Sequence, residues 1–499
     1  MGAASEHDGP MSPDQHGVVF PLSGDGKRST TALGRAVVAD ALRTSDPTGA
    51  RQAEQETNWR SGYLVHFRRL VEAGLASKDA SLGIATAGLT SLSSRMAVVD
   101  GSGDERVLSE WAASDPQQRL ETVEVTGTGT PELELSLPFH GQRLRGDALR
   151  ERLDAWVTAG VLEPSAADAV RAVMTNPEWL RLDGRTVAVL GAAAEMGPLQ
   201  ALLRWGARVA AVDLPRPELW ERLTQTAGAG AGTLLVPARP GGSETLQRRA
   251  GADLVTDVPA VAGWLGDLPG PLVLGNYVYA DGATNLRLSV AVDALTTRLQ
   301  DARDDLALAF LATPTDVFAV PREAVEQATR NYEHRSGTAR LLGRPLRAAS
   351  AGRLLRRAYV RDADPGINDS LVPQQGPNYA LAKRLQRWRA AVARDAGTPV
   401  SLNVAPPTRT RSVVKNRALA AAYAGANRFG VEVFEPATAN VLMAVLLVHD
   451  LHTAGGPAHD HPWQDEAYGA VHGGLWRSAY APRSALGLAA LLGYGASRS

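Results

Sequence analysis

A tyrosine and a lysine stand four positions apart in the stretch "QQGPNYALAKRLQRWRAAV" at 374–392. The chain has only four lysines among its 52 Lys and Arg residues, so a lysine at this place is unusual. On a helix, Tyr379 and Lys383 lie on the same face, one turn apart. A phenol has a pKa near ~10, and a neighbouring ammonium group favours the phenolate and lowers that pKa. The pair therefore predicts a tyrosine that serves as a general acid or base.

Chance alone seldom produces this spacing. Ten tyrosines and four lysines in 499 residues give ~0.08 expected pairs at this separation, by the frequency reasoning used for any short motif. The spacing therefore favours a functional pair over an exposed helical pair.

A glycine turn follows an apolar run in "RTVAVLGAAAEMGPLQALLRWGARVAAVD" at 185–213, which predicts strand, turn, helix and strand. Such a turn lets backbone N–H groups approach a pyrophosphate. Asp213 ends the second strand, where a carboxylate can bind an adenosine ribose and repel a 2′-phosphate. We therefore predict NAD as the cofactor, while the nearby Arg216 leaves NADP open. The turn residues predicted to bind it are Gly191, Ala192, Glu195, Met196 and Gly197.

Strands and helices that could position these groups recur along the chain. Further apolar runs lie at 271–278, 306–314 and 398–407, with helical stretches between them. Alternation of this kind predicts an α/β fold with a doubly wound parallel sheet (Rossmann-like). An additional mixed α+β N-terminal domain is expected to precede it.

The predicted domains follow from changes in composition. We expect a disordered tail at 1–20, an accessory or oligomerisation domain at 21–180, and the nucleotide-binding domain at 181–499. Within the second region, residues 120–139 alternate around a Gly/Thr turn and predict a hairpin. Residues 146–174 predict two amphipathic helices split near Glu163 and Pro164.

The order of glycine turn, acid-terminated second strand, "YALAK" and "VSLNVAPPTRTRSV" resembles the short-chain dehydrogenase/reductase family. The resemblance covers about 182–315 and 370–415, roughly a third of the chain. It implies that Tyr379 is the catalytic acid/base and that Lys383 lowers its pKa and binds the nicotinamide ribose. The further cofactor contacts that it implies are Asp253 on the adenine side, Asn276 after the fourth strand, and Thr408 or Thr410 after the last.

This chain departs from the family pattern in three places. Leu190 replaces the motif threonine, Glu195 replaces the middle glycine of the turn, and "GNYV" replaces Asn-Asn-Ala-Gly. A carboxylate at position 195 is unfavourable near a phosphate.

The family's catalytic serine also has no counterpart at the expected place. An insertion at 316–372 separates the end of the fifth strand from Tyr379. The hydroxyl is expected from Thr313 or Thr315 at the strand end or from Ser370 in the returning loop, and the likeness of "SLVPQQGPNYALAK" to the family's Ser-to-Tyr stretch favours Ser370. The insertion is expected to shape the substrate site as a lid.

The resemblance implies an NAD(P)-dependent oxidoreductase that moves a hydride between a nicotinamide cofactor and a carbonyl/alcohol substrate. Two alternatives stay open: a nucleotide-binding regulatory or scaffold protein without redox activity, and a dehydratase or epimerase that uses the Tyr/Lys pair.

Composition limits the partners. The formal net charge is −1, which argues against nucleic acid or an acidic membrane surface. The absence of cysteine excludes disulfides and thiolate chemistry, and no segment has the apolar pattern of a signal peptide or a membrane span. We expect a cytoplasmic protein with a small-molecule substrate, a homo-oligomer being possible. No metal site is expected, and the histidines at 449–461 are predicted to line or flank the substrate pocket.

Overall fold

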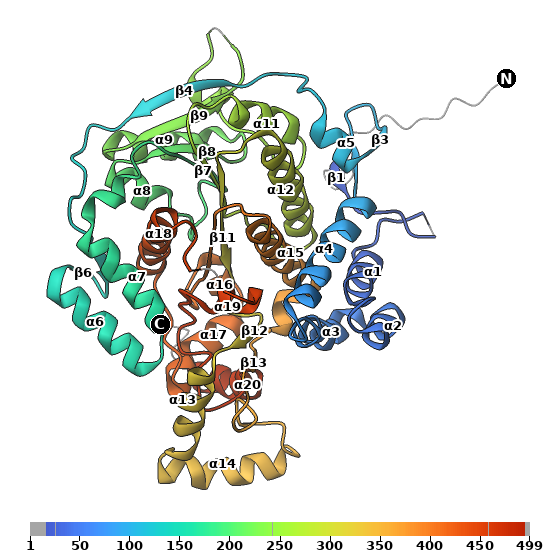
Figure 1. Ribbon diagram of the computed structural model, residues 1–499, viewed down its shortest axis with the longest axis vertical. Coiled ribbons are helices and arrows are strands. Elements are labelled where there is room, and N and C mark those ends of the chain that lie inside the picture. The colour runs from blue at the N-terminus through green and yellow to red at the C-terminus, as the bar shows by residue number, and fades with distance from the viewer. Residues whose placement is uncertain (1–15, 25, 242, 458, 495–499) are drawn as a thin grey trace.

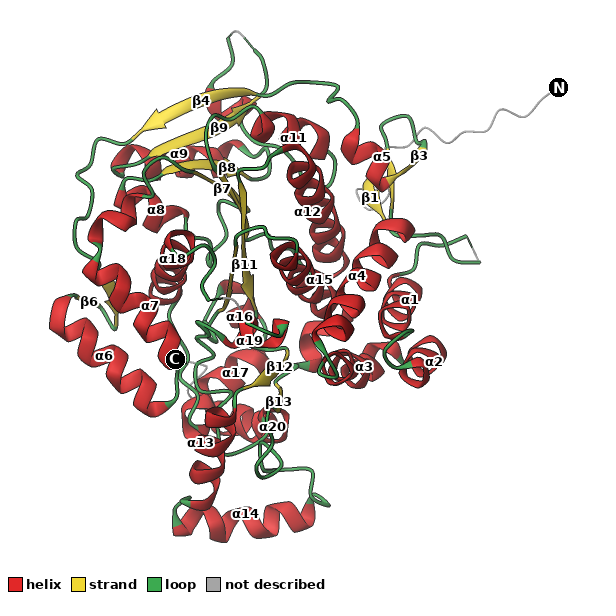
Figure 2. Cartoon of the chain, viewed as in Figure 1, coloured by secondary structure: helices red, strands yellow, loops and turns green. Residues whose placement is uncertain are grey.

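The fold is mixed α/β, built around one seven-stranded sheet (Figures 1 and 2). The computed structural model describes residues 16–24, 26–241, 243–457 and 459–494. Across the sheet the strands are ordered β14-β11-β10-β7-β8-β9-β4, and only β4 runs antiparallel to its neighbour. The strands are β4 (Glu121–Thr126), β7 (Thr186–Leu190), β8 (Arg208–Val212), β9 (Thr233–Ala238), β10 (Leu272–Asn276), β11 (Leu306–Ala312) and β14 (Val400–Val404).

The central strands are apolar throughout because helices cover both faces of the sheet. In β7, Ala188 and Leu190 belong to one hydrophobic core, and Val187 and Val189 belong to the other. This division follows from the alternation of side chains along a strand. The first core is closed by α11 (Val258–Gly266), α12 (Gly282–Ala302) and α15 (Gly376–Asp395), and the second by α8 (Leu199–Trp205), α9 (Pro217–Ala229) and α18 (Pro436–His452).

The order of the strands reverses at β7. From β7 the chain adds β8 and β9 on one side, then returns to place β10, β11 and β14 on the other. The segments that leave β7 and β10 therefore diverge, which opens a crevice at the carboxyl edge of the sheet. This crevice holds the candidate site described below.

The hairpin prediction for residues 120–139 is wrong. β4 pairs with β9 along its whole length, from Glu121 opposite Ala238 to Thr126 opposite Thr233. The second half of the predicted hairpin instead forms β5 (Leu137–Phe139), which pairs with β6 (Gln142–Leu144). The alternating pattern of β4 suits any half-exposed strand, and its partner is distant in sequence.

The predicted terminal tail is also partly ordered. Residues 1–15 lie outside the described residues, but β1 (Gly17–Val19) pairs with β2 (Ala97–Val99). The two helices expected at 146–174 are confirmed as α6 (Gly146–Ala159) and α7 (Pro164–Thr175).

The region predicted as a separate N-terminal domain packs around the sheet (Figure 1). It contributes the edge strand β4, and α7 packs on α18. On the other face α4 (Lys78–Arg95) packs on α15, where Gly88 lies against the ring of Trp388. A boundary near residue 180 thus separates β4 from its own sheet. The other elements here are α1 (Thr30–Leu42), α2 (Pro47–Gln55), α3 (Trp59–Gly74), β3 (Glu105–Val107), α5 (Leu108–Ala113) and the short 3-10 helix η2 (Pro177–Arg181).

The insertion forms a small substructure of its own between β11 and α15. β12 (Val317–Val320) and β13 (Gly366–Asp369) pair antiparallel, and α13 (Arg322–Glu333) and α14 (Gly337–Ala349) extend beyond them (Figure 1). The remaining elements are α10 (Leu246–Arg249), η3 (Pro373–Gln375), α16 (Arg411–Lys415), α17 (Arg417–Gly425), η4 (Ala426–Phe429), α19 (Pro462–Ala467) and α20 (Pro482–Gly493). Among the described residues, no helix is long and apolar enough to cross a membrane.

Candidate functional site

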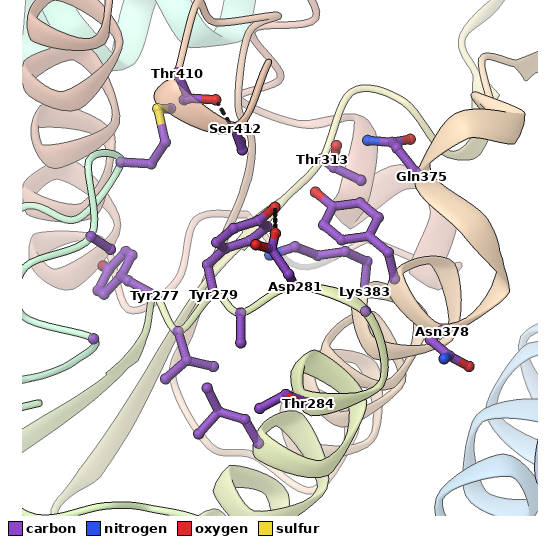
Figure 3. Close-up of a pocket in the computed structure, with 18 of the residues that line it drawn as sticks. Tyr277, Tyr279, Asp281, Thr284, Thr313, Gln375, Asn378, Lys383, Thr410 and Ser412 are labelled. Carbon is purple, nitrogen blue, oxygen red and sulfur yellow. Dashed lines mark hydrogen bonds between the residues drawn. The ribbon is translucent and has the colours of Figure 1, made fainter. Parts of the chain in front are cut away.

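A cavity of about 1540 Å³ lies at the carboxyl edge of the sheet. Residues that directly follow five of the strands line it, together with the first turns of α15. Figure 3 shows polar side chains around this space, with the Tyr279 hydroxyl bonded to Asp281 at 3.0 Å and Thr410 bonded to Ser412 at 3.0 Å. The lining residues after the strands are Gly191 (β7), Asp213 (β8), Tyr277 (β10), Thr313 (β11) and Ala405 (β14).

Tyr379 and Lys383 both line this cavity from α15, as expected for residues one helical turn apart. The Tyr379 ring meets the edge of Tyr279, with centroids 6.3 Å apart. Burial raises the pKa of Tyr379 to about 12, although a hydrogen bond with Thr313 lowers it in part. At neutral pH this phenol is therefore a proton donor.

The predicted effect of Lys383 on that pKa is not found. Among the groups that shift the pKa of Tyr379, Lys383 does not appear; the carboxylate of Asp316 and the hydroxyl of Tyr279 raise it further. Lys383 Nζ instead donates to Gln386 Oε1 at 3.0 Å and to the Leu311 carbonyl at 3.4 Å. Burial without a carboxylate partner lowers the pKa of Lys383 to about 8. The helix spacing brings the two residues to one cavity, but the amine loses its proton at a lower pH than the phenol, so it does not lower the pKa of Tyr379 as expected.

A chain of amides connects Lys383 to the sheet. Gln386 accepts from Lys383, and its Nε2 donates to Asn276 Oδ1 at 3.3 Å. Asn276 and Gln386 are both buried, so this arrangement fixes where the ammonium group points. Gln386 was not singled out from the sequence, although its position three residues after Lys383 places it on the same helix face.

The hydroxyl group beside Tyr379 comes from Thr313, not from Ser370. Thr313 Oγ1 lies 2.9 Å from Thr315 Oγ1, and both threonines line the cavity. Ser370 is buried outside the cavity and donates to Asn368 Oδ1 at 2.5 Å. The preference for Ser370 is therefore not supported by the geometry. The segment 316–372 contributes no lining residue to this cavity, so the insertion does not cover it as a lid.

The glycine turn passes close to the neighbouring strand. Gly191 has φ +79°, and a Cβ there would lie 3.0 Å from the Tyr277 carbonyl oxygen. Five amides of the turn already donate within the protein, which leaves those of Glu195 and Met196 as donors without a partner in the described chain. The five committed amides are Gly191 and Ala192 to the Val212 carbonyl, Ala193 to Asp213, Ala194 to the Gly191 carbonyl, and Gly197 to the Ala194 carbonyl.

The carboxylates of Asp213 and Glu195 both accept hydrogen bonds from within the protein. Asp213 accepts from the Ala193 and Leu214 amides, each at 2.8 Å, and burial raises its pKa. A carboxylate has about four lone-pair sites, so Asp213 can still accept from a ribose. Glu195 Oε1 lies 3.2 Å from Arg411 Nε, and its Oε2 accepts from the Arg411 amide at 2.9 Å. The turn is therefore tied to the segment after β14.

The other predicted contacts divide between the cavity and its surroundings. Met196, Asp253 and Thr408 line the cavity, whereas Ala192 and Gly197 do not. The Asp253 carboxylate accepts from the Val255 amide at 2.9 Å, and Thr408 donates to the Pro406 carbonyl at 2.8 Å.

The histidines predicted to flank the pocket do not line the cavity. His452 stacks on Trp179 with centroids 4.7 Å apart, and His461 caps α19. In the described ranges, no three or more His, Asp or Glu residues are grouped so as to hold a metal ion.

No protein-family model matches this chain. No curated protein matches it either.

Proposed function

We propose that this protein is an NAD(P)-dependent oxidoreductase of the short-chain dehydrogenase/reductase type, acting on a carbonyl/alcohol pair. The observation that carries the proposal is the cavity shared by Tyr379, Lys383 and Thr313, which lies where the strand order reverses. A mostly parallel sheet with that strand order and helices on both faces supports a Rossmann-like, doubly wound fold. The volume of the cavity, about 1540 Å³, exceeds the ~300–1,000 Å³ typical of a single-ligand pocket. A space of this size suits a dinucleotide and a substrate together.

The residues present fit a nicotinamide dinucleotide in most respects. Close backbone approach at Gly191 and the two uncommitted amides at Glu195 and Met196 suit a pyrophosphate. Asp213 would bind the adenosine ribose, which favours NAD. Lys383 and Asn276, connected through Gln386, would face the nicotinamide end. When bound, the cofactor supplies or accepts the hydride.

The protein's own part is proton transfer and charge stabilisation. With a pKa of about 12, Tyr379 keeps its proton at neutral pH and can donate it to a carbonyl oxygen that gains negative charge. The Thr313 hydroxyl, held by Thr315, would donate to the same oxygen. The mostly protonated Lys383 adds positive charge to the site. At neutral pH the resting tyrosine therefore carries the proton that reduction of a carbonyl consumes, and the phenolate left after the transfer must take up a proton from solvent before the next turnover.

The direct test combines cofactor binding with a Tyr379→Phe variant. NADH and NADPH are titrated while nicotinamide fluorescence is followed, and oxidation of the cofactor is measured with a panel of small carbonyl compounds. We expect binding to persist in Tyr379→Phe while kcat falls by about 10²–10⁴-fold, the usual contribution of general acid catalysis. Tyr332→Phe, on α13 outside the cavity, is the control and should keep full activity. Turnover that is unchanged in Tyr379→Phe would refute the assigned role.

A nucleotide-binding scaffold without redox activity is the second candidate. The raised pKa of Tyr379, to which Lys383 makes no contribution, favours it, because the activation of the tyrosine that the redox role was expected to need is then missing. Binding of NADH without turnover of any carbonyl, and without dependence on Tyr379, would support it. Deuterium uptake from D₂O into substrate without net change in cofactor would instead indicate dehydration or epimerisation.

A further inference from the structure

A second, smaller pocket adjoins the cavity at its Tyr379 end. It has a volume of about 80 Å³, and three residues, Thr315, Pro407 and Tyr423, line both spaces. Thr315 reaches Tyr379 through Thr313. Tyr423 lies near enough to Tyr379 for the two hydroxyls to interact, and this proximity adds to the effect of burial in raising the pKa of Tyr423. The small pocket, here called the side pocket, therefore begins beside the proposed proton donor.

The side pocket offers almost no hydrogen bonds to an occupant. Its serine hydroxyls already donate within the protein, Ser370 to Asn368 and Ser478 to the Phe429 carbonyl. Arg483 is the only charged residue lining it within the described chain; its Nη2 pairs with the buried Asp369 at 3.1 Å, and its buried Nη1 has no hydrogen-bond partner among the described residues. Thr315 is bonded to Thr313 and Tyr423 contributes a phenol, while the remaining walls are aliphatic or aromatic. A polar group placed against these apolar walls would lose its hydration and could gain a partner only from Tyr423 or Arg483.

The walls are also held in place. α17 and α20 touch through their backbones, because a Cβ on Gly425 would collide with the Ala489 carbonyl and one on Gly493 with the Ala421 carbonyl. Ala422 of α17 and Ala485 of α20 are buried and line the pocket from its two helices. Small side chains at these positions leave the space open, so its width is set by the helix packing.

We infer that the side pocket binds the apolar group attached to the substrate carbonyl, and that this group is a short branched aliphatic chain. The inference rests on the proposed function, since it places the reacting carbonyl at Tyr379 and Thr313. An apolar cavity of roughly 150 Å³ holds a benzene ring, so a pocket of about 80 Å³ suits a branched chain of a few carbons better than an aromatic ring.

The test uses three methyl ketones that differ only in the apolar group: butan-2-one (ethyl), 4-methylpentan-2-one (isobutyl) and phenylacetone (benzyl). kcat/KM is measured from cofactor oxidation, and binding to the protein is measured separately by ligand-observed saturation-transfer NMR. We expect the isobutyl ketone to exceed the ethyl ketone by about tenfold or more in kcat/KM, and the benzyl ketone to give no gain over ethyl.

Ala422→Leu fills the side pocket and should lower kcat/KM for the isobutyl ketone about tenfold, which removes its advantage over the ethyl ketone. Ala424→Leu, exposed on the same helix, is the matched control and should keep the preference. Ala485→Leu blocks the pocket from α20 and gives the same test if Ala422→Leu does not fold.

The outcomes separate this inference from the proposed function. Equal turnover of the three ketones, or a preference unchanged in both pocket variants, would overturn the side-pocket assignment and leave the oxidoreductase proposal standing. Isobutyl ketone binding that Ala422→Leu abolishes, without cofactor oxidation, would support the pocket and refute the redox function. If none of the ketones binds and none is reduced with oxidation of the cofactor, both the side-pocket assignment and the oxidoreductase proposal are refuted.

Discussion

Helix α15 carries ionisable side chains in two environments, called here its core face and its cavity face. The two differ in whether carboxylates pair with these side chains. On its core face, Arg384 and Arg387 contact the two oxygens of Asp316, each at 2.7 Å, and Arg387 also pairs with Glu466 at 2.5 Å. On its cavity face, Tyr379 and Lys383 have no carboxylate partner in the described part of the chain. Both faces are largely withdrawn from water, so they differ in partners more than in burial.

This difference indicates which side chains of the helix stabilise the fold and which could take part in catalysis. A buried charge with well-placed partners is held in one ionisation state. A buried amine without such a partner has its pKa moved toward neutrality, which is the property expected of a group that takes part in chemistry. The unpaired face is the one that meets the cavity.

The largest expected effect comes from breaking the paired face. Asp316→Ala leaves Arg384 and Arg387 buried with only Glu466 to compensate them, and we expect a loss of about 3–5 kcal/mol in the free energy of unfolding. Urea denaturation followed by circular dichroism measures it. Tyr379→Phe is the matched change on the other face and should alter stability by less than about 1 kcal/mol. If the two variants lose equal stability, the two faces do not differ as described.

Lys383→Met should stabilise the protein at neutral pH. The pKa of Lys383 is lowered from 10.5 to about 8, so the folded state binds the proton more weakly than the unfolded state. The resulting penalty is fully present below about pH 8, shrinks as the pH rises, and is gone above the unfolded value. We expect a gain of about 1–2 kcal/mol at pH 7, after allowance for the lost hydrogen bonds.

Urea denaturation at pH 7 and at pH 10.5 measures this change, and exposed Lys415→Met is the control. The gain of Lys383→Met over the native protein should vanish at the higher pH and give way to a small loss of stability, because the charge penalty is gone there while the hydrogen bonds of the amine are still missing from the variant. A destabilised variant at pH 7 would show that the amine is well compensated where it lies.

Gln386→Glu would give Lys383, on the cavity face, a carboxylate partner like those of the arginines on the core face. A carboxylate 3.0 Å from Lys383 Nζ should raise the lysine pKa by about one unit. In the native protein we expect the rate of carbonyl reduction to fall above about pH 8 as Lys383 loses its proton. The variant should move that fall to higher pH, and Gln386→Leu should move it to lower pH. A pH profile that is identical in all three proteins would exclude Lys383 as the titrating group.

The smallest expected effect is that of Thr313→Val. Loss of the hydroxyl removes a hydrogen bond from Tyr379, and such a bond contributes about 0.5–1.5 kcal/mol. We expect kcat to fall about threefold to tenfold with little change in KM, measured by steady-state kinetics. Ser370→Ala should lower kcat less than Thr313→Val does, because Ser370 lines only the side pocket, and a reversed ranking of these two variants would restore Ser370 to the site.

Much of the sheet could be read from local pattern. The apolar runs predict β7, β8, β10, β11 and β14 at the positions where the structure has them. Residues 233–238 form β9, which was not predicted, and this omission also hid the partner of β4. Strand pairing joins segments that are far apart in sequence, and the alternation of one strand does not identify the other.

The sequence by itself determined the two local features of the site: the glycine turn after β7, and a tyrosine and a lysine on one face of α15. These depend only on backbone preference and helix periodicity. Tertiary structure alone decided that Thr313 and not Ser370 lies beside Tyr379, that Glu195 pairs with Arg411, and which way the two pKa values move. Partner choice and desolvation depend on which distant segments meet and how much water they exclude, and neither quantity is local to a stretch of chain.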